Sequence, residues 1–314
     1  MKKIKKYSWM MLAAMLILAA CSKTPDIDHN SMLDGDKIFD PSLYDSAKYL
    51  VSVRIDNPTT KDIQTPVVIA VHGYSATTYE WDEFRDFADN SGEIYVSQVL
   101  LGGHGRTYDE FKNSSWKDWQ ASILDEYRAL KAKGYAKISF AGSSAACPLM
   151  LDLIKEGEIG YNGLDHIFLI DPIVIPSDKL MSIVGLVGPM LGYLETDMTN
   201  EEEGHWYHFR PQETLQELQD LTEKIRKDLQ KGFKLPQGTD MKVYKSIHDP
   251  TADAVSAVLI NKGLKNYDGS KVSIQMLESD LHVVTRLKGR DDVTQHDRDI
   301  QKEVFDDMYR ILTK

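Results

Sequence analysis

Residues 137–147, KISFAGSSAAC, restrict the fold of this chain more than any other stretch. An apolar run at residues 138–141 leads into a cluster of very small side chains, and apolar residues at helical spacing follow at 149–154. This pattern predicts a strand, a very tight turn and a helix. A serine in such a turn stands above the end of the strand in a strained backbone conformation, as in a nucleophile elbow.

Two serines fit the small-x-Ser-x-small pattern of this turn. Ser144 lies between Gly142 and Ala146, and Ser143 fits the same pattern one residue earlier. We favour Ser144 as the nucleophile because glycine, the residue that best tolerates unusual φ and ψ angles, then occupies the first small position. Taken alone, the pattern also fits an ordinary glycine- and serine-rich loop.

The N-terminus predicts export. Residues 1–20 carry four lysines followed by an apolar stretch that is too short to span a bilayer, as in a signal peptide. Residues 18–21, LAAC, resemble the lipobox of bacterial lipoproteins, which implies cleavage before Cys21 and lipid attachment to its thiol. The alternative is an ordinary secretory signal with an incidental cysteine. We expect a protein anchored by lipid to a bacterial membrane, on the periplasmic or outer-surface side, with residues 21–42 as a polar tether.

The charge of the chain excludes one class of partner. Removing the four lysines of the signal from 37 basic residues leaves 33 against 48 acidic residues, a net charge of −15. Such a surface does not suit nucleic acid, and anionic lipid head groups would repel it. Once Cys21 is modified, Cys147 is the only thiol, so no intramolecular disulfide can form. We interpret Cys147 as a small buried side chain.

The rest of the chain alternates predicted strands and helices, which indicates a mostly parallel, doubly wound sheet. Strands are expected at residues 50–55, 66–71, 94–100, 166–170, 241–247 and 272–277, in addition to the strand before the serine turn. Helices are expected at 116–134, 212–230, 254–260 and 297–312, the first with Ser114 or Ser115 as its N-cap. The alternation stops between about residues 173 and 241.

Two glycine-containing loops follow predicted strands. His72-Gly73-Tyr74-Ser75 could leave the Tyr74 N–H free to form an oxyanion hole with the Ala145 N–H, at about 3 kcal/mol per donor. His72 could equally be a loop histidine satisfied by backbone groups. The later loop at 102–106, GGHGR, lacks the Lys-Ser/Thr and the spacing of phosphate-binding loops, so a nucleotide site is not expected there.

Four motifs in order, VHGYS, GGHGR, WKDW and AGSSAAC, resemble those of the α/β-hydrolase family. The similarity is greatest to carboxylesterases and monoacylglycerol lipases, which carry HGF or HGxxG, PGHG, Trp-x-Asp-Trp and GxSxGG at similar spacings. The chain departs from this pattern at Ala146 and Cys147, where two glycines are usual. The resemblance runs from about residue 50 to the end. It implies an α/β-hydrolase core at 43–171 and 241–314, with a helical cap at 172–240 inserted after strand 6.

The resemblance also assigns catalytic roles. Ser144 would be the nucleophile, and His282, in the loop after the last strand, would be the base, in the order Ser, Asp, His that this fold requires. The acid of the triad would lie in the loop after the strand at 241–247, where Asp249 matches. Asp253, otherwise a helix N-cap, and Asp171 stay open as alternatives for that acid.

The cap implied by the resemblance would cover the active site and could open as a lid. Its apolar residues would form an acyl-binding wall, unless they only pack the cap on the core; they are Ile183, Val184, Leu186, Val187, Met190 and Leu191. His205 and His208 have a spacing that could hold a metal but lack a neighbouring ligand motif, so neither a metal nor a cofactor is expected.

The expected function is hydrolysis of carboxylic esters through an acyl-enzyme, with a small ester or a monoacyl lipid as substrate. Two alternatives stay open. One is a hydrolase of amide, peptide or thioester bonds on the same fold, because a fold does not fix a substrate. The other is an inactive binding lipoprotein, suggested by Ala146, Cys147 and Leu281.

Overall fold

The computed structural model describes residues 24–28, 31–33, 57–177 and 192–314. Several predictions therefore lie outside the described residues: the signal peptide, lipidation at Cys21, the strand at 50–55 and the acyl-binding wall at 183–191. The strands of the main sheet are β1 (Val67–Val71), β2 (Tyr95–Val99), β3 (Ile138–Ser143), β4 (His166–Ile170), β8 (Asp240–Ser246) and β10 (Ser273–Leu277). The helices are α3 (Thr60–Gln64), α4 (Asp82–Ser91), α5 (Tyr108–Lys112), α6 (Trp116–Ala132), α7 (Ala146–Lys155), α9 (Gln212–Lys231), α10 (Val255–Gly263) and α11 (Gln295–Leu312).

The main sheet has six described strands in the order β10-β8-β4-β3-β1-β2, and every pairing is parallel. Because parallel strands all end at the same edge of a sheet, the loops that follow β1, β3, β4, β8 and β10 meet at one edge. Over the described residues the predicted order of strands and helices is confirmed, and the boundaries differ from prediction by a few residues. β3 continues through Ser143, two residues further than expected.

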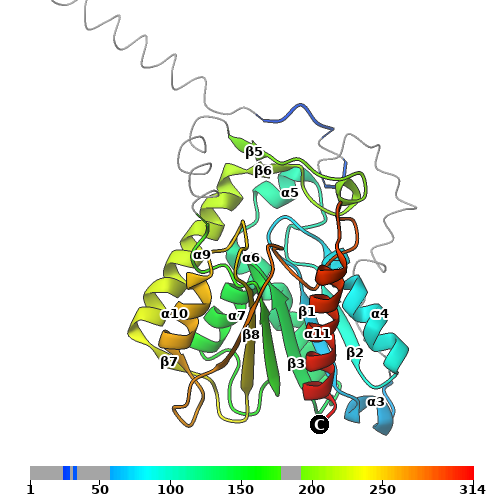
Figure 1. The fold of residues 1–314 in the computed structure, drawn as a ribbon, viewed down its shortest axis with the longest axis vertical. Helices are drawn as coiled ribbons and strands as arrows, with labels where there is room; N and C mark the ends of the chain where they lie inside the picture. The colour runs from blue at the N-terminus through cyan, green and yellow to red at the C-terminus, as the bar shows by residue number, and fades with distance from the viewer. Residues whose placement is uncertain (1–23, 29–30, 34–56, 178–191) are drawn as a thin grey trace, which may run out of the picture.

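Helices cover both faces of the sheet. Along β1 the side chains alternate between two hydrophobic clusters, with Val67 and Ile69 in one cluster and Val68 and Ala70 in the other. The first cluster includes residues of α6, α7, α9 and α10, and the second includes residues of α4 and α11. Figure 1 shows these two groups of helices on opposite sides of the strands. A strand buried on both faces reads as a continuous apolar run, which is what the β1 sequence shows.

The start of α6 resolves the predicted N-cap in favour of Ser115. Ser115 and Asp118 form a capping box, in which each side chain accepts the backbone N–H of the other residue. The hydroxyl of Ser114 instead accepts a 2.8 Å hydrogen bond from the Trp119 indole. Trp119 is fully buried, as expected of a packing residue.

The described part of the segment between β4 and β8 contains a short antiparallel pair, β5 (Tyr193–Glu195) and β6 (Phe209–Pro211), followed by α9. In Figure 1, β5 and β6 lie beyond one end of the main sheet, and α9 runs beside α10. An ion cluster around a buried carboxylate ties α9 to the core, since Asp152 of α7 contacts Lys224 of α9 at 2.5 Å and Lys117 of α6 at 3.1 Å. Within the described ranges, none of the helices has the length and apolar character needed to cross a membrane.

Several short elements were not predicted from the sequence. They are α3, α5, a 3₁₀ turn at Thr78–Trp81, another at Glu202–Gly204, the β5–β6 pair and two two-residue strands, β7 (Phe233–Lys234) and β9 (Leu264–Lys265). Each is only two to five residues long, so neither helical nor strand periodicity can establish itself within it.

Candidate active site

Ser144 occupies the sharp turn between β3 and α7. Its backbone has a φ of 50°, in the left-handed region that non-glycine residues rarely adopt. The turn leaves no room for a larger side chain at Gly142, because a Cβ there would lie 2.5 Å from the Phe140 ring and 3.0 Å from the Ala146 Cβ. The Ser144 N–H donates to the Ile170 carbonyl at 2.9 Å, which fixes the turn against β4. Steric crowding therefore explains the run of small residues in the sequence.

Three predicted residues come together above the ends of the strands. The Ser144 Oγ lies 2.8 Å from Nε2 of His282, and Nδ1 of His282 lies 2.8 Å from Oδ2 of Asp249. With a proton on Nδ1 donated to the carboxylate, Nε2 is left as an acceptor for the serine hydroxyl. This arrangement can remove the proton from Ser144 and hold it on the imidazole. The three side chains come from the loops that follow β3, β8 and β10.

Ser143, the other serine of the turn, faces away from this group. It is fully buried, and its hydroxyl donates to the Glu80 carboxylate and lies 3.3 Å from the Val71 carbonyl. Glu80 also accepts the Gly73 N–H at 2.8 Å. The geometry thus favours Ser144 as the serine in contact with the imidazole and gives Ser143 a structural partner.

The two alternative aspartates have other contacts. Asp171 accepts the N–H groups of Ser246, Val283 and Val284 at 2.7, 3.0 and 3.2 Å, so it ties the end of β8 to the loop that carries the histidine. Asp253 accepts the Val255 N–H at 2.7 Å at the start of α10. α10 begins at Val255 with Ala254 as its N-cap, so the prediction of Asp253 as the N-cap is wrong by one residue.

Asp249 is held in its charged form. Burial alone raises the pKa of its carboxyl, but the attraction and hydrogen bonds of His282 and Lys245 outweigh burial and lower the pKa to about 2. Its second oxygen, Oδ1, accepts the N–H groups of Thr251 at 2.8 Å and Ala252 at 3.0 Å. Lys245 was not singled out from the sequence. Its carboxylate partners come from separate loops, and no local motif marks a lysine near the end of a strand.

Two backbone N–H groups are available beside Ser144. Among the described residues, neither the Tyr74 N–H nor the Ala145 N–H has a hydrogen-bond acceptor. The loop that carries Tyr74 passes very close to the serine, since a Cβ on Gly73 would lie 3.0 Å from the Ser144 Cβ. An oxyanion hole formed by these two N–H groups stays a prediction. A developing negative charge on a carbonyl oxygen is what such paired donors stabilise.

His72 holds this loop in place through hydrogen bonds to backbone groups. Its Nδ1 lies 2.8 Å from the Gly73 carbonyl, and its Nε2 accepts the Leu101 N–H at 3.1 Å. The ring is fully buried, and burial lowers the pKa of His72 to about 4, so the ring is neutral at pH 7. Both nitrogens are satisfied by backbone groups, which is the structural interpretation considered from the sequence. The phenol of Tyr74 pairs with the Thr214 hydroxyl at 2.7 Å, joining the same loop to α9.

The loop that carries the histidine is constrained from both sides. Val283, which follows the histidine, has a φ of 64°, an unusual value for a β-branched residue. Its N–H is held by Asp171, and the guanidinium of Arg290 donates to the carbonyls of His282 and Val283. Arg290 also donates to the Arg286 carbonyl at 2.8 Å. Such strain persists only where the surroundings fix it, so these contacts hold the imidazole over Ser144.

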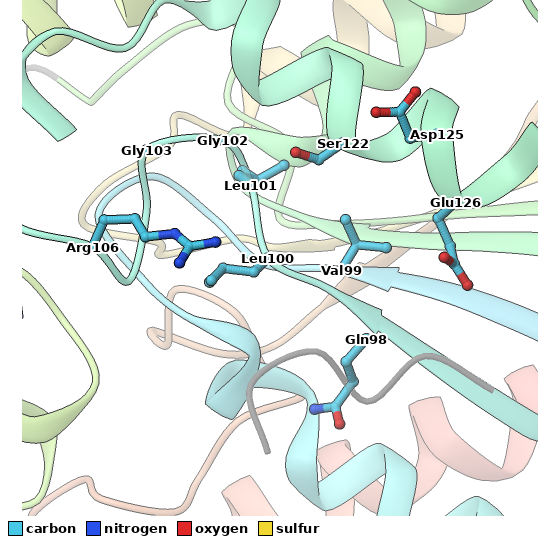
Figure 2. Close-up of a pocket in the computed structure, with 10 residues that line it drawn as sticks. All are labelled: Gln98, Val99, Leu100, Leu101, Gly102, Gly103, Arg106, Ser122, Asp125 and Glu126. Carbon is cyan, nitrogen blue, oxygen red and sulfur yellow. The ribbon is translucent and has the colours of Figure 1, made fainter. Parts of the chain in front are cut away.

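The GGHGR loop lines a pocket of about 510 Å³ at the end of β2. Figure 2 shows the Arg106 side chain at one side of this pocket, with Asp125 and Glu126 of α6 at the other. Two carboxylates would repel a phosphate, which agrees with the absence of a phosphate-binding motif in the sequence. The residues that line this pocket include none of the proposed catalytic side chains.

The two histidines considered as metal ligands have separate partners. His208 lies 3.0 Å from a Glu195 carboxylate oxygen, and His205 stacks on the Tyr79 ring with centroids 3.8 Å apart. Among the residues that the structure describes, no group of three or more His, Cys, Asp or Glu side chains is arranged to hold a metal. Cys147 is a buried free thiol whose pKa burial raises, in agreement with its interpretation as a small packing residue.

Comparisons with known proteins identify the fold of the chain. No protein-family model matches the chain. A carboxylesterase of Bacillus subtilis (strain 168) is 25% identical over 237 residues, which cover 73% of this chain and 89% of that protein. A structure from a study of two metagenome-derived lipolytic enzymes has a TM-score of 0.61 at 15% identity and covers 79% of this chain and 94% of that one. A soluble variant of the monoglyceride lipase of Saccharomyces cerevisiae has a TM-score of 0.60 at 12% identity, with 82% and 88% covered. The chain has the α/β-hydrolase fold, and the predicted fold class is confirmed.

Proposed function

We propose that this chain, with its α/β-hydrolase fold and its similarity to a carboxylesterase, is a serine hydrolase that cleaves carboxylic esters. The observation that carries the proposal is the continuous hydrogen-bonded series from the Ser144 hydroxyl through His282 to Asp249. The geometry alone fits several acyl-transfer reactions. The similarity to a carboxylesterase favours an ester as the substrate.

The first half of the reaction forms an acyl-enzyme. Nε2 of His282 takes the proton of the Ser144 hydroxyl as its Oγ attacks the ester carbonyl carbon. The Tyr74 and Ala145 N–H groups then hold the negative charge that develops on the carbonyl oxygen. Asp249 keeps the imidazole in the correct tautomer and stabilises its charged form. The imidazolium gives its proton to the leaving alcohol as the carbon–oxygen bond breaks.

The second half repeats this sequence with water. His282 takes a proton from a water molecule, whose oxygen attacks the acyl carbon bound to Ser144. The same two N–H groups hold the second oxyanion. As the acyl–oxygen bond breaks, the imidazolium returns a proton to the Ser144 oxygen and the carboxylic acid leaves. Each proton that the imidazole takes up is given back within the same half-reaction.

The direct test is turnover of p-nitrophenyl butyrate by Ser144→Ala, compared with Ser143→Ala. We expect Ser144→Ala to lose about 10⁶ in kcat, as the loss of a triad nucleophile does. Ser143→Ala is the matched control, because it removes the hydroxyl of the neighbouring serine, which faces Glu80 and not His282. Loss of turnover in Ser143→Ala with full turnover in Ser144→Ala would contradict the proposed nucleophile.

We also propose that the protein is exported and anchored through a lipidated Cys21, and that it acts on small esters or monoacyl lipids. The lipobox-like sequence at 18–21 supports the anchor, and the predicted apolar wall at 183–191 supports an acyl substrate. Cys21→Ala should move the protein from the membrane fraction to the soluble fraction of cells that express it. A variant that stays in the membrane fraction would rule out this anchor.

A further inference from the structure

Lys245, near the end of β8, is a fully buried lysine beside the proposed triad. Its Nζ lies 2.5 Å from Oδ2 of Asp249 and 3.2 Å from Oδ1 of Asp171, and all three side chains are inaccessible to solvent. A buried ammonium is very costly unless it is paired and hydrogen-bonded. A buried pair is no evidence of stability by itself, because apolar residues of similar volume often do as well. A role in the chemistry of the site is the better account of this lysine.

One carboxylate oxygen contacts both the imidazole and the ammonium. Oδ2 of Asp249 contacts the imidazole of His282 at 2.8 Å and the ammonium of Lys245 at 2.5 Å. The other oxygen is occupied by two backbone N–H groups. The imidazole therefore faces a carboxylate whose charge a fixed ammonium already neutralises in part. Asp171, on the far side of Lys245, contributes a second negative charge that balances the lysine.

The other titratable groups around this cluster have partners of their own. Glu80 of the 3₁₀ turn accepts hydrogen bonds from Gly73 and Ser143, and Arg290 after the histidine loop donates to backbone carbonyls. Cys147 of α7 is neutral, because burial raises the pKa of its thiol. Within the described part of the chain, the ammonium of Lys245 forms ion pairs with the two aspartates alone.

We propose that Lys245 is a positioning residue that sets the pH at which His282 becomes protonated, by sharing the Asp249 carboxylate with it. The proposal rests on the proposed esterase function, because His282 must act as the base. A positive charge beside the carboxylate disfavours a second positive charge on the imidazole. The imidazole therefore stays neutral, and competent as a base, to a lower pH than beside an unshared carboxylate.

The test is the pH dependence of kcat/KM for p-nitrophenyl butyrate in Lys245→Gln. Glutamine keeps a hydrogen-bond donor for Asp249 but removes the charge. We expect the acidic limb of the profile to move to higher pH by about one unit, the lower end of the range for a charge about 4–6 Å away. The matched control is Lys242→Gln, which makes the same change on the same strand, where the lysine pairs with Asp307. Its acidic limb should stay within about 0.2 units of the wild-type value.

A second variant tests the direction in which the acidic limb moves, without changing the lysine. Asp171→Asn removes the charge that balances Lys245, so its acidic limb should move to lower pH. This variant decides the question if Lys245→Gln does not fold. An acidic limb that does not move, or that moves in the opposite direction, would overturn the inference. The proposed esterase function would still stand as long as the wild type turns over the ester. No turnover by the wild type on any ester would instead remove the proposed function.

Discussion

Gly73 is the residue on which the distance between the oxyanion loop and the nucleophile depends. The loop after β1 passes so close to Ser144 that a single methyl group on Gly73 would lie 3.0 Å from the serine Cβ and 3.6 Å from its Oγ. The Gly73 N–H is also fixed by Glu80. Steric crowding therefore explains the glycine at position 73, and hydrogen bonds to backbone groups explain the histidine at position 72.

Gly73→Ala should lower kcat for p-nitrophenyl butyrate by about 10² to 10³, the cost of losing one oxyanion donor, because the methyl group pushes the Tyr74 N–H away from the serine. Gly160→Ala is the matched control, since a Cβ there would meet no atom within 4 Å. We would measure kcat and the urea midpoint of both variants. Full activity in Gly73→Ala would show that the loop lies further from Ser144 than described here.

Both Ser143 and Ser144 fit the local sequence pattern, and the sequence favours Ser144 only through the position of Gly142. Orientation decides between them, and orientation depends on distant groups. Ser143 turns toward Glu80, which lies 63 residues away in sequence, and Ser144 turns toward His282, which lies 138 residues away. Lys245 escaped prediction for the same reason, since Asp171 is 74 residues away. Asp249 and His282 could be assigned because the order of residues in the resembled family specifies their loops.

At the scale of elements, the long strands and helices were predictable because their periodicity is strong. The apolar run of β1 and the capping box of α6 are both readable from a few consecutive residues. The β5–β6 pair was not predictable, because three residues per strand cannot show alternation. The conformation of the histidine loop also depends on tertiary contacts, namely those that Asp171 and Arg290 make with its backbone.

Arg290→Met tests whether these contacts hold the histidine loop. The variant removes the donors to the carbonyls of His282 and Val283, so the strained backbone at Val283 should relax and the imidazole should leave its position over Ser144. We expect kcat to fall by about 10 to 100-fold, since misplacement by about 1 Å costs that much. Arg298→Met, on an exposed position of α11, is the control. Unchanged kcat in Arg290→Met would show that Asp171 alone is enough to hold the loop.

Across the described part of the molecule, burial favours the neutral form of His72 and His104, which are fully buried, and of His205, which is partly buried. Burial lowers the pKa of His72 and of His205 to about 4 each, and it holds the pKa of His104 well below its usual value of 6.5. In the unfolded chain these groups titrate near their usual value of 6.5. Between the two values the unfolded chain binds more protons than the folded one, so stability is complete above pH 6.5 and falls as the pH drops toward 4. The contribution of Asp249 to stability is lost at lower pH, below the usual pKa of 3.8 for its carboxyl and toward its folded-state pKa of about 2.

The free energy of unfolding should therefore decrease between pH 6.5 and 4, with His72 alone contributing on the order of 3 kcal/mol. Urea unfolding at several pH values would measure the slope. His72→Asn should reduce the number of protons that the protein binds on unfolding by about one, and His248→Gln, which replaces an exposed histidine, is the matched control. A free energy of unfolding that is constant over this range would contradict the neutral, buried state of these rings.

Every step of the proposed reaction depends on Ser144 as the nucleophile of an acyl-transfer site that His282 and Asp249 complete. The most direct measurement is reaction of the protein with a fluorophosphonate, followed by mass-spectrometric mapping of the modified peptide. We expect a single adduct on Ser144, and no adduct in His282→Ala, because the hydroxyl then lacks its base. An adduct on another residue, or no adduct in a folded wild-type protein, would contradict this role of Ser144.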